Sequence, residues 1–250
     1  RQCNDSYPGP IHIGLPSDIA YIEVDTSSPV GSVTRDIIYH NDIKKIVSLL
    51  VKSRRPLMAI GLTAAQLNIQ TELLAFLDFY RMPVVITPMA KGLIPEDHPC
   101  YAGVLFHSLS DYLEDIYDKT DLVIGIGYDP VEYNYESWMP QVPLVHFNTR
   151  ETDIHSSGTI AQYTGPSEDW FRILKNLDIG SLVFEQTIIK GIRDEMDSVF
   201  KGFTHHFGPA AALKVLQDEL PDNVILTADV GSHLHLIGQF WQTHGIGKII

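Results

Sequence analysis

The sequence has little cysteine and no long apolar run, and each absence excludes a class of protein. Cys3 and Cys100 are the only cysteines among 250 residues, too few for a disulfide framework or a four-cysteine zinc site. A membrane-spanning helix needs about 18 consecutive apolar residues, and the sequence contains no such run. We therefore predict a protein of the reducing cytoplasm that does not contact membranes.

Basic residues are also scarce. Lys and Arg together number 18 against 31 Asp and Glu, which gives a formal net charge of −13. A surface with this acidic excess repels phosphate backbones, so nucleic acid is not an expected partner. The remaining composition, 44% hydrophobic and 20% charged, is that of an ordinary globular protein of one or two domains.

Short apolar runs alternate with helical patterns in the middle of the chain. The strand-like runs lie at 56–61, 84–87, 121–127 and 143–148. Apolar residues recur at helical spacing at 43–50, where Asn41 or Asp42 could cap the first turn, and at 67–79, 109–117 and 167–177. Because the runs are continuously apolar rather than alternating, they indicate parallel strands covered on both faces. The sequence thus predicts an α/β fold with a doubly wound parallel sheet over residues 43–177.

We interpret the flanking segments as pieces of neighbouring α/β domains. Residues 1–20 contain a short alternating strand at 10–16, and the mixed residues 21–42 and 178–202 are interpreted as linkers. Both ends of the chain are expected to be cuts within a longer protein.

The segment 203–250 is expected to be the truncated start of another domain. Gly208-Pro209 opens a predicted helix that runs to Leu220, because proline suits the first helical turn. Residues 224–228 are then expected to form a buried strand.

The strongest candidate for chemistry follows that strand. Gly231 would let a ligand approach the backbone, and the first free N–H groups of the next helix would attract an anion. Ser232 and His233 add hydrogen-bond donors, so a phosphate-bearing cofactor fits this turn. Alternatively, Asp229 and Ser232 only cap the helix. His233 and His235 have no third clustered ligand, so we predict no metal site.

Two glycine-containing loops are weaker candidates. Gly125-Ile126-Gly127 is half of a dinucleotide fingerprint, but the third glycine is missing and Pro130 lies where the helix should open. A strand that ends in a tight turn explains it equally. In the loop 88–99, Lys91 could meet a phosphate or simply be a solvated loop lysine.

Aromatic and histidine clusters leave alternatives open. The aromatic residues could line a pocket, pack internally or form a subunit interface; they are Tyr128, Tyr133, Tyr135 and Trp138. His205-His206 is interpreted as flanking a linker rather than binding metal. No Ser-His-Asp or Cys-His constellation can be argued from the sequence.

In this order the segments resemble a thiamine-diphosphate-dependent enzyme of the acetolactate synthase and 2-oxoacid decarboxylase superfamily. Residues 9–18 resemble the last strand of the pyrimidine-binding domain, and 41–177 resemble the central domain. The loop 88–99 and the run 127–133 are the most specific parts, and the latter is similar to catabolic acetolactate synthases. Residues 227–233 match the start of the diphosphate-binding domain.

This resemblance implies roles that the residues alone do not. Val230, Gly231, Ser232 and His233 would contact the diphosphate of the cofactor. The family's activating glutamate and metal-binding motif would fall outside the sequence, so we expect no catalytic or metal-binding residue here and no turnover by this piece alone. The parent would be a homo-oligomer that uses thiamine diphosphate and magnesium to decarboxylate pyruvate and join it to an acceptor.

Two further expectations concern the central domain. Tyr128-Asp129-Pro130 departs from the arginine-bearing pattern of FAD-binding relatives, so FAD is not expected. The Lys91-Gly92 loop also resembles oxalyl-CoA decarboxylases, which leaves a 2-oxoacid or oxalyl-CoA decarboxylase as an alternative. A non-catalytic nucleotide-binding α/β module is a second alternative, which the segment 229–233 disfavours.

Overall fold

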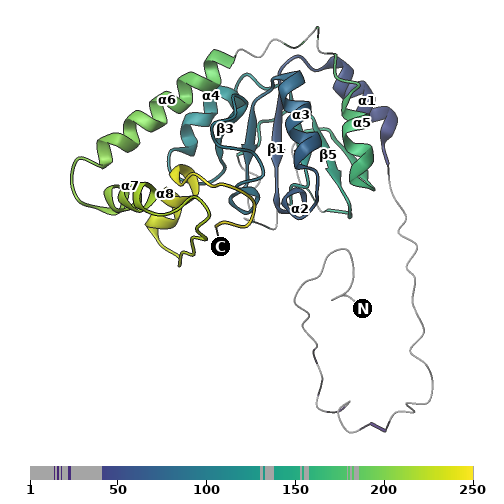
Figure 1. Cartoon of the computed structure of the whole chain (residues 1–250). Helices are drawn as coiled ribbons and strands as arrows, with labels where there is room; N and C mark the ends of the chain where they lie inside the picture. Colours follow the sequence, from purple (N-terminus) through teal and green to yellow (C-terminus); the bar gives the residue numbers. More distant parts are fainter. Residues whose placement is uncertain are drawn as a thin grey trace. The chain divides into compact units, whose positions relative to one another are not determined.

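The computed structural model describes residues 41–129, 138–152, 158–178 and 186–249, together with positions 14, 16, 18, 22–23, 132, 154, 180 and 182. The chain divides into two compact units, Arg1–Ile38 and Tyr39–Ile250 (Figure 1). The predicted strand at 10–16 and most of the linker 21–42 lie outside the described residues, as do Tyr133 and Tyr135.

A parallel sheet forms the centre of the second unit. Its strand order is β3-β2-β1-β4-β5-β6, and every pair of neighbours is parallel. The strands are β1 (Pro56–Ile60), β2 (Val84–Ile86), β3 (Tyr101–Val104), β4 (Leu122–Ile126), β5 (Leu144–Asn148) and β6 (Ile160–Thr164). The order reverses between β1 and β4, as in doubly wound dinucleotide-binding folds. The predicted α/β fold class is therefore confirmed.

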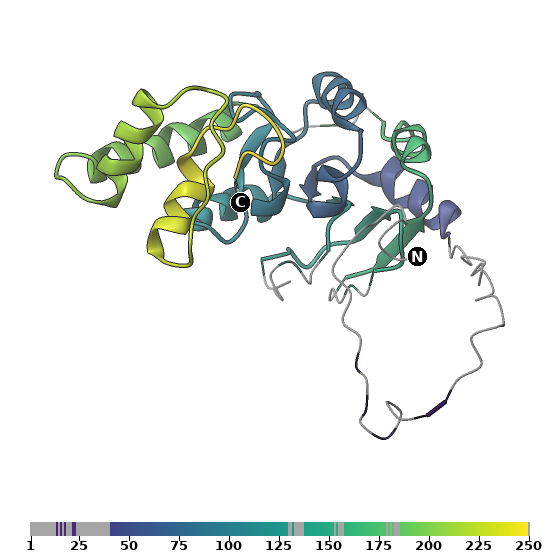
Figure 2. The ribbon, with the colours of Figure 1, turned by 60° about the horizontal axis from the view of Figure 1, so that its bottom comes forward.

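Helices cover both faces of this sheet (Figures 1 and 2). On one face lie α1 (Ile43–Lys52), α2 (Leu62–Ala65), α3 (Gln70–Tyr80) and α5 (Trp170–Leu174), which follows the 3-10 turn η5 (Ser167–Asp169). On the other lie η3 (Ser110–Leu113), α4 (Glu114–Tyr117) and α6 (Gln186–Phe203). Successive residues of β1 face opposite helical layers, Met58 into the first and Leu57 into the second. This alternation explains why the strands are apolar throughout.

The two edge strands were not predicted. β3 is short and contains Gly103, and β6 alternates buried with half-buried residues, so neither has the continuous apolar run of an inner strand. Asp42 occupies the predicted cap position of α1, but the side-chain capping bond is missing. Asn41 Oδ1 instead accepts a hydrogen bond from the Thr164 backbone N–H (2.9 Å).

The predicted linker 178–202 contains the long helix α6, which the sequence analysis missed. Its buried residues Ile189, Ile192 and Met196 recur at helical spacing and pack on the sheet. The many charged residues on its outer face masked this signal. The role of the segment as a connection between domains stays a prediction.

After α6 the chain forms two helices that lie side by side, α7 (Pro209–Glu219) and α8 (Ser232–Phe240) (Figure 2). Pro209 occupies the first turn of α7, as predicted. The expected buried strand at 224–228 was wrong. Leu226 makes one isolated parallel bridge, to Ile249, and Ile225 is 55% exposed. The described residues supply only this one neighbouring segment, which is too little to bury a strand.

No described helix combines the length and the apolar character needed to cross a bilayer.

We expect Gly127→Ala to destabilise the fold by at least about 2 kcal/mol. Gly127 has φ +56°, and an added Cβ would lie 2.3 Å from the backbone nitrogen of Ala64. The matched control is Gly191→Ala in α6, where no atom lies within 4 Å of the added Cβ. That control should raise stability by up to about 1 kcal/mol through helix propensity. Urea denaturation of both variants measures the difference, and equal stabilities would contradict the proposed crowding at Gly127.

Candidate cofactor-binding turn and its surroundings

The turn before α8 presents an open helix N-terminus. Gly231 is the residue before the helix, and no side chain caps the first turn. Asp229 Oδ1 instead accepts a hydrogen bond from the Val230 backbone N–H (2.7 Å), one residue outside the cap. Val230 is 88% exposed, and the Ser232 and His233 side chains are exposed as well. The alternative in which Asp229 and Ser232 only cap the helix is therefore not what the structure has.

The backbone at Gly231 does not itself require glycine. Its φ of 164° and ψ of 174° are extended values that any residue adopts. An added Cβ would lie 2.7 Å from the imidazole of His233, the far end of a side chain that can turn away.

Gln239 attaches α8 to the central sheet. Its Oε1 accepts a hydrogen bond from the backbone N–H of Val104 on the edge strand β3 (2.9 Å). The next residue is Phe240, the last of α8, and its ring stacks on Phe200 of α6 with centroids 4.1 Å apart. These two contacts fix the direction of the helix that carries the turn.

The loop 88–99 holds a buried ion pair. It begins with the 3-10 turn η2 (Pro88–Ala90). Lys91 Nζ lies 3.1 Å from Glu96 Oε1, and the Lys91 side chain is almost completely buried. Burial lowers the pKa of Lys91, and the neighbouring Glu96 carboxylate opposes that shift. Lys91 is therefore not a solvated loop lysine. It is also not placed to meet a phosphate, because its ammonium is buried against Glu96.

The same loop is joined to the residues that follow α8. Glu96 accepts hydrogen bonds from the Thr243 hydroxyl (2.7 Å) and the Thr243 backbone N–H (3.2 Å). Gly92, with φ +88°, comes so close to Gly245 that an added Cβ would lie 2.2 Å from its carbonyl oxygen. The backbone of Gly245 therefore occupies the space where a side chain at position 92 would lie.

A carboxylate occupies the crevice where the strand order reverses. Glu132 Oε1 accepts a hydrogen bond from the Leu62 backbone N–H after β1 (2.8 Å), and Oε2 accepts one from the Thr87 hydroxyl after β2 (2.6 Å). Burial raises the pKa of this carboxyl group, and the hydrogen bonds that it accepts oppose the shift. Gly127 ends β4 with a positive φ, so the half fingerprint is the tight turn and not a dinucleotide loop.

Tyr128 and Trp138, the two described residues of the predicted aromatic cluster, pack internally. Tyr128 is buried, and the indole N–H of Trp138 donates to its hydroxyl (3.2 Å). The Tyr117 and Trp138 rings also lie against each other, with centroids 5.4 Å apart. Of the predicted cluster, Tyr128 and Trp138 thus belong to the core.

The histidines separate into buried and exposed groups. His146 is buried on β5, and its Nε2–H donates to the Tyr128 carbonyl (2.7 Å). His235 lies against His107, with ring centroids 5.2 Å apart, while His205 and His206 are exposed between α6 and α7. Within the described ranges, no group of three or more His, Cys, Asp or Glu side chains is arranged to hold a metal ion.

The comparison with protein families matches the sheet and its helices. Residues 43–164 match the family described as "Thiamine pyrophosphate enzyme, central domain". The matched span runs from the first residue of α1 to the last residue of β6. Residues 43–164 are a thiamine pyrophosphate enzyme central domain. The predicted family resemblance is therefore confirmed.

Several curated relatives of this thiamine pyrophosphate enzyme domain extend well beyond it. The chain is 26% identical over 95% of its length to a probable acetolactate synthase large subunit of Methanocaldococcus jannaschii, and covers 43% of that protein. It is 24% identical over 93% of its length to the acetolactate synthase large subunit of Corynebacterium glutamicum, and covers 40% of it. A putative pyruvate decarboxylase of Schizosaccharomyces pombe is 28% identical over 59% of the chain, which covers 28% of that protein. The chain thus spans less than half the length of these relatives.

We expect the stability of the protein to fall as the pH drops from 7 to 5. Burial lowers the pKa of His146 to about 4 and that of His107 to about 4, below the ordinary value of 6.5. Between those values the unfolded chain binds protons that the folded chain excludes, so each histidine contributes a loss of up to about 1.4 kcal/mol per pH unit.

Thermal unfolding of His146→Gln measured at several pH values tests this expectation. The variant should show a smaller slope of stability against pH between about 5 and 6, because one excluded proton is gone. A slope that His146→Gln leaves unchanged would contradict the assignment.

Proposed function

We propose that this chain is part of a thiamine-diphosphate-dependent enzyme that acts on 2-oxoacids, most similar to acetolactate synthase. The extent of the matches carries this proposal. The acetolactate synthases of M. jannaschii, C. glutamicum and Escherichia coli match 95%, 93% and 96% of the chain, including the turn before α8. The pyruvate decarboxylases of S. pombe and Saccharomyces cerevisiae match 59% and 52%.

The turn before α8 fits the diphosphate of the cofactor. Its helix N-terminus has no side-chain cap, its residues are exposed, and Gly231 carries no side chain that would keep a ligand away. Gly231 and Ser232 would supply backbone N–H groups, and the Val230 and His233 side chains would flank the diphosphate. When bound, thiamine diphosphate would supply a nucleophilic carbon for addition to the keto group and an electron sink for the electron pair left behind when CO₂ departs.

The described residues hold the turn rather than carry out the reaction. Gln239 fixes α8 on β3, and Thr243 ties its end to Glu96. Magnesium belongs to the proposal through the family, and we assign none of its ligands to this chain. We also assign no catalytic residue here.

We further propose that the central domain binds no FAD. The Glu132 carboxylate bonds the N–H and hydroxyl groups that line the crevice between β1 and β4, where doubly wound folds bind nucleotides. An anionic phosphate would have to displace it against charge repulsion. The visible absorption spectrum of the purified protein tests this point, because bound flavin would colour it yellow.

A 2-oxoacid decarboxylase is the second candidate, favoured by the pyruvate decarboxylase relatives. The resemblance of the Lys91-Gly92 loop to oxalyl-CoA decarboxylases gives this candidate less support. Lys91 is paired with Glu96, and Gly92 packs against the backbone of Gly245. A homo-oligomer in the cytoplasm belongs to the same proposal, because sites of this family form between two subunits.

We expect Gly231→Val to weaken thiamine diphosphate binding by at least about tenfold, since a branched side chain would occupy the space of the diphosphate. Fluorescence titration of the complete apo-protein in the presence of Mg²⁺ measures the affinity. Gly208→Val is a matched control, because Gly208 also precedes a helix in extended conformation (φ −169°, ψ −172°). Equal affinities of the two variants would remove the assignment of the turn.

The reaction itself is tested with pyruvate. We expect the complete protein, supplied with thiamine diphosphate and Mg²⁺, to release CO₂ and form acetolactate, which decarboxylates in acid to detectable acetoin. Acetaldehyde as the main product would instead support the decarboxylase. No consumption of pyruvate would contradict both.

A further inference from the structure

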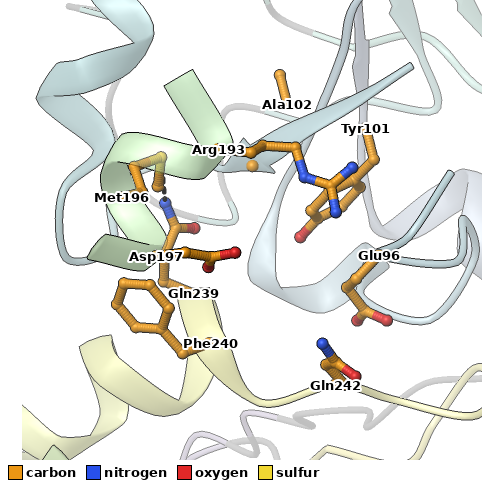
Figure 3. A pocket seen from close by; sticks show the side chains of 10 residues that line it. Glu96, Tyr101, Ala102, Arg193, Met196, Asp197, Gln239, Phe240 and Gln242 are labelled. Atoms are coloured by element: carbon orange, nitrogen blue, oxygen red, sulfur yellow. Dashed lines mark hydrogen bonds between the residues drawn. The ribbon is translucent and has the colours of Figure 1, made fainter. Parts of the chain in front are cut away.

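A small cavity lies along the free edge of β3, away from the turn before α8. It has a volume of about 70 Å³ and is bounded by the start of β3, by α6 and by the end of α8 (Figure 3). Its charged and hydrogen-bonding side chains are those of Glu96, Tyr101, Arg193, Asp197, Gln239 and Gln242. The side chains of Met196 and Phe240 supply apolar surface beside them.

The Tyr101 hydroxyl is the unusual group in this cavity. Tyr101 is only 4% exposed, and its hydroxyl has no hydrogen-bond partner among the described residues. Figure 3 shows the hydroxyl directed into the cavity, toward the side where Asp197 lies. A buried hydroxyl without a partner costs about 1–3 kcal/mol, so a group that accepts its hydrogen bond would remove a real penalty.

The cavity offers separate positive and negative ends. The Arg193 guanidinium lies over the Tyr101 ring, 5.9 Å from its centroid, and Nη1 donates to the His98 carbonyl (3.3 Å). A guanidinium has five N–H donors, so most of them are left for a ligand. Across the cavity, the Asp197 carboxylate has no ion pair or hydrogen bond within the described ranges.

The other carboxylate of the cavity is already neutralised. Glu96 is bound by Lys91 Nζ (3.1 Å) and by the Thr243 hydroxyl (2.7 Å). The charges left for a ligand are therefore one cation, Arg193, and one anion, Asp197. A ligand of net charge zero with both signs matches this pair best, since a simple anion would face Asp197 and a simple cation would face Arg193.

We propose that this cavity binds a small α-amino acid such as glycine or L-alanine. The carboxylate of the amino acid accepts hydrogen bonds from the Tyr101 hydroxyl and Arg193, and its ammonium donates to Asp197. By the measure of an engineered cavity of about 150 Å³ that holds the six heavy atoms of benzene, this cavity of about 70 Å³ takes about three heavy atoms. The carboxylate group of the amino acid therefore lies inside, and the remaining atoms extend toward the exposed Asp197 side chain. The site is independent of the proposed reaction and of the turn before α8.

Titration calorimetry of the complete protein with L-alanine and with two probes that each lack one of its charged groups tests the proposal. L-Alanine carries both charges, propionate lacks the ammonium and ethylammonium lacks the carboxylate. We expect L-alanine to bind at least about tenfold more tightly than either single-charge probe, as for the loss of one hydrogen bond to a charged group. Absence of L-alanine binding at millimolar concentration, or equal binding of propionate, would overturn the proposal.

Variants locate the binding within the cavity. Tyr101→Phe keeps the buried ring and removes only the hydroxyl, and Asp197→Asn keeps the side-chain shape. Each should weaken L-alanine binding by about tenfold. Asp194→Asn is the matched control, because Asp194 lies on the same helix and pairs with Lys190 at the surface (3.5 Å). If both cavity variants bind L-alanine with unchanged affinity and unfold at the same temperature as the unsubstituted protein, the proposed site is wrong.

Discussion

The buried ion pair between Lys91 and Glu96 is the contact on which the arrangement of the candidate site depends. It closes the loop that precedes β3, and Glu96 extends the connection to Thr243 behind α8. A single buried pair thereby joins the central sheet to the last helix. Breaking one side of such a pair leaves an uncompensated charge in the interior, which costs about 3–5 kcal/mol. The position of the turn at Gly231 relative to the sheet is accordingly held by electrostatics as well as by apolar packing.

A second carboxylate close to the same loop is also held by hydrogen bonds within the protein. Glu132 bonds to groups after β1 and after β2, so the protein itself fills the crevice that related folds use for nucleotides. The sequence suggested Lys91 and the turn at Gly127 for ligand binding. Both instead have structural roles, Lys91 in the ion pair with Glu96 and Gly127 in the turn that ends β4. The groups that face solvent lie elsewhere, at the start of α8 and along the edge of β3.

The sequence predicted the inner strands and the helices that cover them, because these are buried and their apolar pattern is continuous. It missed β3, β6 and α6, which lie at edges or carry one polar face, where burial leaves a weaker pattern. For the site, the helix N-terminus at Gly231 was predicted from a glycine followed by a helical pattern, although the strand expected before it is absent. Its role in binding stays a prediction. The partners of Glu96 and Glu132 could not be predicted, since these contacts join groups distant in the chain. Thr243 lies 147 positions from Glu96, and Leu62 lies 70 positions from Glu132.

The length of α6 has a mechanical consequence. Its 18 residues form a rod of about 27 Å. Near its first turn Ile189 is buried against the sheet, and at its last turn Phe200 stacks on Phe240. One stiff strut thus contacts both the central sheet and α8. If α8 tilted, either α6 would have to move against the sheet or the Phe200 and Phe240 rings would have to separate. The central sheet and α8 therefore resist rotation relative to each other.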